Sequence, residues 1–319
     1  MPKQFSGNVL ITGGSGFLGS RLVNLFLEKK CKVRVLDVGT GLLEGRKDPG
    51  LEFVGKESDG GMLNKDLVDK AMEGIDVVCH LAIDWGRSLS IGDLLEINAK
   101  GMVNLLDSAK AHGVKHFLYT SSVVVYGMSK VPRVDEESIC RPEAWNRDPG
   151  PNYSVMKLSL EKFALLYNNY QSLPSSVLRI AVAFDDNKAL RTGRDLSQKV
   201  LKGEPVQVAR GVGRTSIHAE DVARAFYLAA MNEKAYGQVF NVSNPAAFIT
   251  DLDVARVLID ATHSKSKIKI APKPKTSPPI ESISKAANIL GWKPQKGKDA
   301  LRKSMVNTII NMRSQANNA

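Results

Sequence analysis

The chain has little cysteine and no long apolar run. Its 319 residues include only Cys31, Cys79 and Cys140, an odd number scattered along the sequence. This usage indicates neither a disulfide framework nor a CxxC metal site. No stretch approaches the ~20 apolar residues that a membrane-spanning helix requires, and the first residues lack the apolar core of a signal peptide. We therefore expect a cytoplasmic protein with no metal and no membrane contact.

Aromatic residues are missing where positive charge gathers. The formal net charge is +11, from 44 basic and 33 acidic residues, and part of the excess lies at 264–275. No aromatic side chain interleaves with those lysines, so the stacking surface of a single-strand nucleic-acid binder is absent there. A nucleic-acid partner is not expected, whereas an anionic small-molecule substrate agrees with the charge.

Short apolar runs alternate with amphipathic segments through the first half of the chain. The runs at 8–12, 31–37, 76–82, 114–122 and 175–183 are typical of strands, and the segments at 16–30, 63–75, 94–113 and 153–170 of helices. Such alternation predicts βαβ units, and hence an α/β fold with a doubly wound, mostly parallel sheet of the Rossmann type.

A glycine-rich segment joins the first strand to the first helix. In VLITGGSGFLGSRLV, Gly13, Gly16 and Gly19 follow a G-x-x-G-x-x-G spacing. These glycines permit a tight turn, close approach of a pyrophosphate and close helix packing, and the helix N-terminus attracts the phosphates. We therefore predict a dinucleotide site that also includes Ser15, Phe17 and Leu18.

Asp37 ends the second strand, 18 residues after Gly19. A carboxylate at this point accepts hydrogen bonds from a ribose 2′-hydroxyl and repels a 2′-phosphate, which favours NAD over NADP. The alternative is a turn residue before Gly39. The alternation of strands and helices weakens after about residue 183, and proline is dense between 272 and 294. We therefore expect an NAD-binding domain at 1–182, to which the chain returns at about 216–243, and a mainly substrate-binding domain at 183–319.

Two tyrosines precede a lysine by four residues. Tyr126 and Lys130 lie where a strand is expected to leave into a loop, so the two side chains need not meet. Tyr153 and Lys157 lie on an expected helix, where residues i and i+4 share a face. A nearby ammonium lowers the pKa of a tyrosine, which can then exchange protons with a substrate hydroxyl or carbonyl. Ser122, at the carboxyl end of a strand, could orient the substrate oxygen beside Tyr153.

Taken together, the motifs resemble the extended short-chain dehydrogenase/reductase family, in its NAD-dependent epimerase/dehydratase (nucleotide-sugar epimerase-like) branch. The resemblance covers about residues 8–295. It is carried by TGGSGFLG (12–19), Asp37, HLA (80–82), Asn98, TSSVVVYG (120–127), Tyr153 with Lys157, RTSIHAEDVARA (214–225, through His218 and Asp221) and LGWKP (290–294).

The resemblance implies roles for particular residues. Ser122, Tyr153 and Lys157 would form the catalytic set, with Lys157 also on the nicotinamide ribose. Leu81, Ala82 and Asn98 would join the cofactor site, and Arg214 would hold a substrate pyrophosphate unless it is a surface arginine. We expect Asp84, Trp85 and Arg87 to face the substrate. Relatives commonly pair two helices from each subunit, so a homodimer through 94–113 and 153–170 is expected.

The chain also departs from the branch. Lys56 replaces a frequent acidic residue, and Val182 stands where an asparagine helps to hold the substrate diphosphate. TSSVVV carries no acid, which disfavours 4,6-dehydration. The predicted function is therefore an NAD-dependent nucleotide-sugar epimerase working through a keto intermediate. The alternatives are an NAD(P)-dependent dehydrogenase or reductase of a non-nucleotide alcohol or ketone, and a non-catalytic Rossmann binding protein.

Overall fold

The computed structural model describes residues 5–84, 90–186 and 192–317, and the structural statements below concern these residues. The strands are β1 (Asn8–Thr12), β2 (Lys32–Leu36), β3 (Leu51–Val54), β4 (Val77–His80), β5 (His116–Ser122), β6 (Arg133–Val134), β7 (Ser175–Ile180), β8 (Val182–Phe184), β9 (Val206–Ala209), β10 (Gly213–His218), β11 (Val239–Val242), β12 (Asn244–Thr250), β13 (Ile268–Ala271) and β14 (Ile280–Glu281). The helices are α1 (Phe17–Glu28), α2 (Lys65–Met72), α3 (Ile91–Leu94), α4 (Gly101–Ala111), α5 (Pro151–Tyr170), α6 (Thr192–Leu201), α7 (Ala219–Ala229), α8 (Asp251–Thr262), α9 (Ser284–Leu290) and α10 (Lys298–Asn317).

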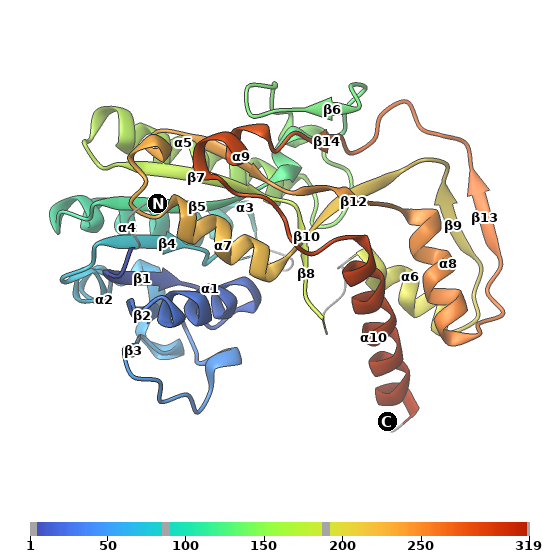
Figure 1. The fold of residues 1–319 in the computed structure, drawn as a ribbon, viewed down its shortest axis with the longest axis horizontal. Coiled ribbons are helices and arrows are strands. Elements are labelled where there is room, and N and C mark those ends of the chain that lie inside the picture. The colour runs from blue at the N-terminus through green and yellow to red at the C-terminus, as the bar shows by residue number, and fades with distance from the viewer. Residues whose placement is uncertain (1–4, 85–89, 187–191, 318–319) are drawn as a thin grey trace.

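A seven-stranded parallel sheet forms the centre of the molecule (Figure 1), in the order β11-β7-β5-β4-β1-β2-β3. The order reverses between β1 and β4, which is the arrangement of a Rossmann sheet. Its central strands are almost wholly buried, as apolar strands covered on both faces must be. The predicted Rossmann-type fold is confirmed.

Helices cover both faces of this sheet. One face packs against α1, α7 and α9 around Phe26, Phe226 and Trp292. The opposite face packs against α2, α4 and α5 around Leu105 and Leu160. Parallel strands joined by helical crossovers produce these two layers.

The later part of the chain builds a smaller group of elements beyond one end of the sheet (Figure 1). It contains the sheet β12-β10-β8, the strand pair β13-β9, and α6, α8 and α10, which share a core around Phe184, Leu258 and Met305. The chain returns to the large sheet through β11, beside β7. No helix among the described residues combines the length and apolar character that crossing a bilayer requires.

The structure differs from the prediction at three elements. Strand β3 was not predicted, because its four residues form the short, half-buried outer edge of the sheet. As a result, Ser122 ends the fifth strand rather than the fourth. The helix expected at 94–113 is divided by a π-helical turn, Leu95–Lys100, and the strand expected at 175–183 divides at Ala181 between two sheets. A π-turn within a helix often marks a functional site.

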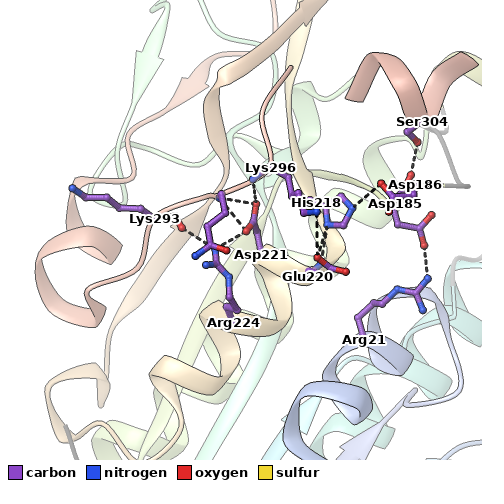
Figure 2. Close-up of polar contacts among 11 residues, drawn as sticks. Arg21, Asp185, Asp186, His218, Glu220, Asp221, Arg224, Lys293, Lys296 and Ser304 are labelled. Carbon is purple, nitrogen blue, oxygen red and sulfur yellow. Dashed lines mark hydrogen bonds and ion pairs between the residues drawn. The ribbon is translucent and has the colours of Figure 1, made fainter. Parts of the chain in front are cut away.

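Two motifs far apart in the sequence meet at the start of α7 (Figure 2). The Asp221 carboxylate accepts hydrogen bonds from the main-chain N–H groups of Gln295 (3.0 and 3.1 Å) and Lys296 (3.0 Å). The Trp292 indole N–H donates to the Asp221 carbonyl over 2.9 Å. These contacts join α7 to the chain that follows α9, and they give a structural role to Asp221 and to the motif at 290–294.

Candidate active site

A cavity of about 1350 Å³ runs along the carboxyl ends of the central strands. Ligand sites of open α/β sheets lie at this edge. The structure brings most of the predicted site residues to its walls: Gly13, Gly16, Phe17, Leu18, Asp37, Leu81, Ala82, Asp84, Ser122, Tyr153, Lys157 and Arg214. The predicted Trp85 and Arg87 lie outside the described residues.

The glycine loop has the geometry that a pyrophosphate site needs. Gly13 adopts φ +67°, and a Cβ added there would lie 2.8 Å from the main-chain nitrogen of Ala82. A Cβ on Gly19 would lie 2.1 Å from the Gly13 carbonyl oxygen. Helix α1 has no acidic residue in its first turn, so its N-terminus is free to attract phosphate. These residues fit NAD.

Asp37 is fixed at the edge of the cavity by backbone amides. Its carboxylate accepts hydrogen bonds from the N–H of Ser15 (3.0 Å) and of Val38 (2.9 Å). Ser15 is itself buried behind the wall, with a hydroxyl that has no hydrogen-bond partner among the described residues. Ser15 therefore contributes to the site by orienting Asp37 rather than by lining the cavity.

Asn98 also lies behind the wall. Its side-chain oxygen accepts from the Asp84 N–H (2.8 Å), and its amide group donates to the Asp84 carbonyl (3.1 Å). Asn98 belongs to the π-helical turn, which aims its side chain at this loop. We therefore assign it to holding the loop after β4, where direct contact with the cofactor had been expected.

Thr12 is a functional residue that the sequence analysis missed. Its hydroxyl lies 2.7 Å from Nδ1 of His80 and accepts from the N–H groups of Leu81 and Ala82, both at 3.2 Å. Burial, and then the charge of Lys157, lower the pKa of His80 to about 3. A neutral His80 thus helps to fix the loop at Leu81 and Ala82. The position of His80 in the motif HLA (80–82) was the sequence feature that pointed to this role.

Tyr153 and Lys157 share one face of α5, as the spacing predicted. The Lys157 ammonium lies 5.6 Å from the centre of the Tyr153 ring and donates to the Thr120 carbonyl over 2.7 Å. Lys157 is 2% exposed, and burial lowers its pKa to about 7, while the charge of Glu161 raises it. This lysine therefore changes its charge within the physiological pH range.

Tyr126 occupies a different environment. It lies in the 3₁₀ turn Val123–Tyr126, where a loop was expected, and is 2% exposed. Its hydroxyl donates to Asn241 (2.7 Å) and accepts from Arg179 (2.9 Å). Burial raises its pKa above the ordinary value. Tyr126 is thus a packed structural residue, in agreement with the choice of Tyr153.

Arg214 is buried in the cavity wall, which excludes the surface alternative. It is 7% exposed, and its Nε has no hydrogen-bond partner among the described residues. Burial, followed by the charge of Arg147, lowers its pKa to about 9. Asp251 raises it, but this carboxylate is paired with Arg147 at 2.7 Å. Asp148 also raises the pKa of Arg214. A buried guanidinium whose Nε has no hydrogen-bond partner in the described part of the chain is suited to an anionic ligand.

A buried carboxyl in the same wall was also missed. Glu281 is 3% exposed and accepts from the hydroxyl groups of Thr215 and Ser243. Burial raises its pKa, although these hydrogen bonds lower it. It lies in a proline-rich segment whose short strand β14 gives no periodic signal.

Val123 and Val124 line the cavity after Ser122, so no acidic residue directly follows that serine in the cavity wall.

The Rossmann sheet and the glycine loop define a dinucleotide-binding protein. Comparison with known families gives the finer answer: the chain belongs to the NAD dependent epimerase/dehydratase family, whose model matches residues 9–243. NAD is the cofactor of this family, which confirms both the predicted resemblance and the predicted cofactor.

The relatives carry different activities. The chain is 28% identical to the uncharacterized protein y4nG of Sinorhizobium fredii, over 82% of this chain and 62% of that one. It is 29% identical to a 3 beta-hydroxysteroid dehydrogenase/Delta 5-->4-isomerase of Mycobacterium tuberculosis, over 80% and 69%. The Thermus thermophilus UDP-glucose 4-epimerase, solved with NAD, is 25% identical with a TM-score of 0.70, over 96% and 99%. The chain thus spans less than two thirds of y4nG.

Proposed function

We propose that the protein is an NAD-dependent epimerase that acts on a nucleotide-sugar, with Ser122, Tyr153 and Lys157 as its catalytic residues. The observation that carries the proposal is their position in one cavity with the glycine loop, Asp37 and the buried Arg214. When bound, NAD supplies a hydride acceptor and donor. The reaction class is then oxidation of a sugar carbinol to a ketone and its reduction from the other face.

The chain's own residues divide the remaining work. Tyr153 exchanges a proton with the substrate hydroxyl, and Ser122 orients that oxygen by a hydrogen bond. Lys157, in contact with the Tyr153 ring and the Thr120 carbonyl, biases Tyr153 toward tyrosinate when protonated. Gly13, Gly16 and the α1 N-terminus hold the cofactor pyrophosphate, and Asp37 holds the adenosine ribose.

Arg214 supports the nucleotide-sugar assignment. Burying a charged side chain costs free energy unless a partner compensates it, and a diphosphate supplies two negative charges that a guanidinium binds in a bidentate manner. The similarity to a UDP-glucose 4-epimerase structure also supports a nucleotide-sugar substrate.

A second candidate is a dehydrogenase or reductase of a non-nucleotide alcohol or ketone. It is favoured by the apolar part of the cavity wall, which includes Val182, Leu258, Met305 and Met312. The similarity to a 3 beta-hydroxysteroid dehydrogenase/Delta 5-->4-isomerase also supports this candidate. The two candidates differ in the fate of the cofactor, since an epimerase retains NAD through a redox-neutral cycle and a dehydrogenase exchanges it at every turnover.

The test is incubation with UDP-glucose and NAD, with sugar products identified by NMR and NADH followed by absorbance. An epimerase forms the C4 epimer without net NADH, and Tyr153→Phe abolishes the product while keeping NAD binding. If neither UDP nor any other nucleoside diphosphate binds at millimolar concentration, the nucleotide-sugar assignment fails and the dehydrogenase takes its place.

We also propose that two copies pair through α5 and the segment that begins at α3. Ile91 (64% exposed), Leu95 (50%), Val155 (42%) and Leu166 (45%) lie on these helices as large exposed apolar side chains. Exposed apolar surface of this kind marks an interaction site. Sedimentation should show a homodimer, whereas a monomer at all accessible concentrations would reject the pairing.

A further inference from the structure

A buried ion pair lies one helical turn beyond Lys157. Glu161 and Arg179 have side chains 0% and 3% exposed. Arg179 donates from Nη2 to one Glu161 oxygen (2.9 Å) and from Nε to the other (3.0 Å), so the pair is bidentate. The Ser121 hydroxyl also donates to Glu161. Ser121 and Arg179 are direct neighbours on β5 and β7, so both strands hold this carboxylate from the sheet side.

The groups around Lys157 come from three elements. Helix α5 supplies Tyr153 and Glu161, and β5 supplies the Thr120 carbonyl and Tyr119, whose ring centre lies 5.1 Å from the ammonium. Strand β4 supplies His80, which is neutral because its pKa is lowered to about 3. Burial raises the pKa of Tyr119 well above its ordinary value, so this phenol is also uncharged.

Glu161 is therefore the charge that opposes the burial of Lys157. Desolvation favours the neutral amine, and the negative charge of Glu161 favours the ammonium. The ammonium matters for catalysis because only the charged form favours a tyrosinate at Tyr153.

We propose that Glu161, locked in place by Arg179 and Ser121, is a positioning residue that keeps Lys157 in its ammonium form near neutral pH. Glu161 thereby sets the pH range in which Tyr153 exchanges its proton. The consequence for Tyr153 rests on the proposed function, but the effect on Lys157 does not, and the two are tested separately.

The first measurement uses no substrate. The amine of Lys157 is labelled with limiting acetic anhydride between pH 5 and 10, and the modified peptide is quantified by mass spectrometry. In the wild type the reactivity should rise with a midpoint near 7. In Glu161→Gln the midpoint should fall by about one unit or more, because a neighbouring opposite charge shifts a pKa by that amount. At pH 6.5 this shift corresponds to about threefold higher reactivity.

A matched control separates charge from packing. Ser121→Ala removes a donor to the same carboxylate but leaves its charge, so it should not lower the midpoint. Because Glu161→Gln leaves Arg179 buried without its partner, the double variant Glu161→Gln/Arg179→Met provides the same test without that charge. It should lower the midpoint by less than Glu161→Gln does, because the positive charge of Arg179 is removed together with the negative charge of Glu161.

The second measurement is the pH profile of kcat. If Glu161 acts through Lys157, the inflection of the kcat profile near neutral pH should shift in Glu161→Gln. The shift should have the same direction as that of the Lys157 labelling midpoint, while KM changes little. A folded Glu161→Gln variant whose Lys157 midpoint stays within about 0.3 unit of the wild type overturns the proposal, since neighbouring charges act at or above this scale. A double variant whose midpoint does not fall at all also overturns it. If the Lys157 midpoint shifts as expected but the wild type does not act on nucleotide-sugars, the inference about Glu161 stands and the proposed function is rejected.

Discussion

Replacing Arg214 with methionine should make the ligand-free protein more stable and its anion binding weaker. The fall in the pKa of Arg214 from 12.5 to about 9 means that folding buries this charge at a cost of up to about 5 kcal/mol. Methionine keeps most of the volume and removes the charge. Comparable replacements of buried charges by apolar residues stabilise by about 1–4 kcal/mol. For a chain of this size we expect the Tm at pH 7.5 to rise by about 2–8 °C.

Binding should change in the opposite direction. A charge-assisted hydrogen bond contributes about 1.5–3 kcal/mol, so Arg214→Met should weaken UDP binding by roughly ten- to a hundredfold. Isothermal titration measures this directly.

Arg179→Met is the matched control. This arginine is equally buried, but it forms a bidentate pair with Glu161. Its removal leaves a buried carboxylate uncompensated and should cost about 3–5 kcal/mol. Opposite signs for the two arginines would separate a ligand-binding charge from a structural one. If Arg214→Met lowers the Tm and leaves UDP binding unchanged, Arg214 is structural and the argument from its burial is wrong.

The remaining predictions concern the tyrosines and the cofactor. Tyr153→Phe should reduce kcat at least a hundredfold, since a general acid–base group contributes about 10²–10⁴, with NADH affinity nearly unchanged. Tyr126→Phe should instead lower the Tm, because Arg179 and Asn241 lose a buried partner, while kcat changes little; a larger kinetic loss for Tyr126 would reverse the assignment. Fluorescence titration should show tighter binding of NADH than of NADPH, and Asp37→Ser should narrow that difference. Equal binding by the wild type would remove Asp37 from the ribose.

The sequence was most informative where one local pattern determines one local structure. The glycine spacing predicted the loop before α1, and the i, i+4 spacing placed Lys157 against Tyr153, because both relations are fixed by backbone geometry. The sequence also separated the surroundings of the two tyrosines, since Tyr153 was expected on a helix and Tyr126 at the end of a strand. These parts of the site need no knowledge of the distant chain.

The missed residues depend on contacts between distant segments. Glu281 reaches the cavity wall from a two-residue strand paired with β6, and no periodicity marks so short an element. Thr12 acts through His80, 68 residues away. The burial of Arg214 follows from the packing of β10 between β8 and β12. Asn98 was assigned correctly to the neighbourhood of the site, but the π-turn that aims it at Asp84 has no sequence signal.

The junction at Asp221 has a consequence for how sequences of this kind can diverge. Gln295 and Lys296 bind Asp221 only through their main-chain N–H groups. Apart from the ion pair of the Lys296 ammonium with Glu220 at 3.9 Å, their side chains are therefore free to change over time, provided that neither position becomes proline, which lacks the N–H. Asp221 has no such freedom, because asparagine would offer one acceptor oxygen in place of two. Substitution is thus restricted at Asp221 but tolerated at the two residues whose main chain it binds. An alignment of related sequences will therefore underestimate how closely the two segments are joined.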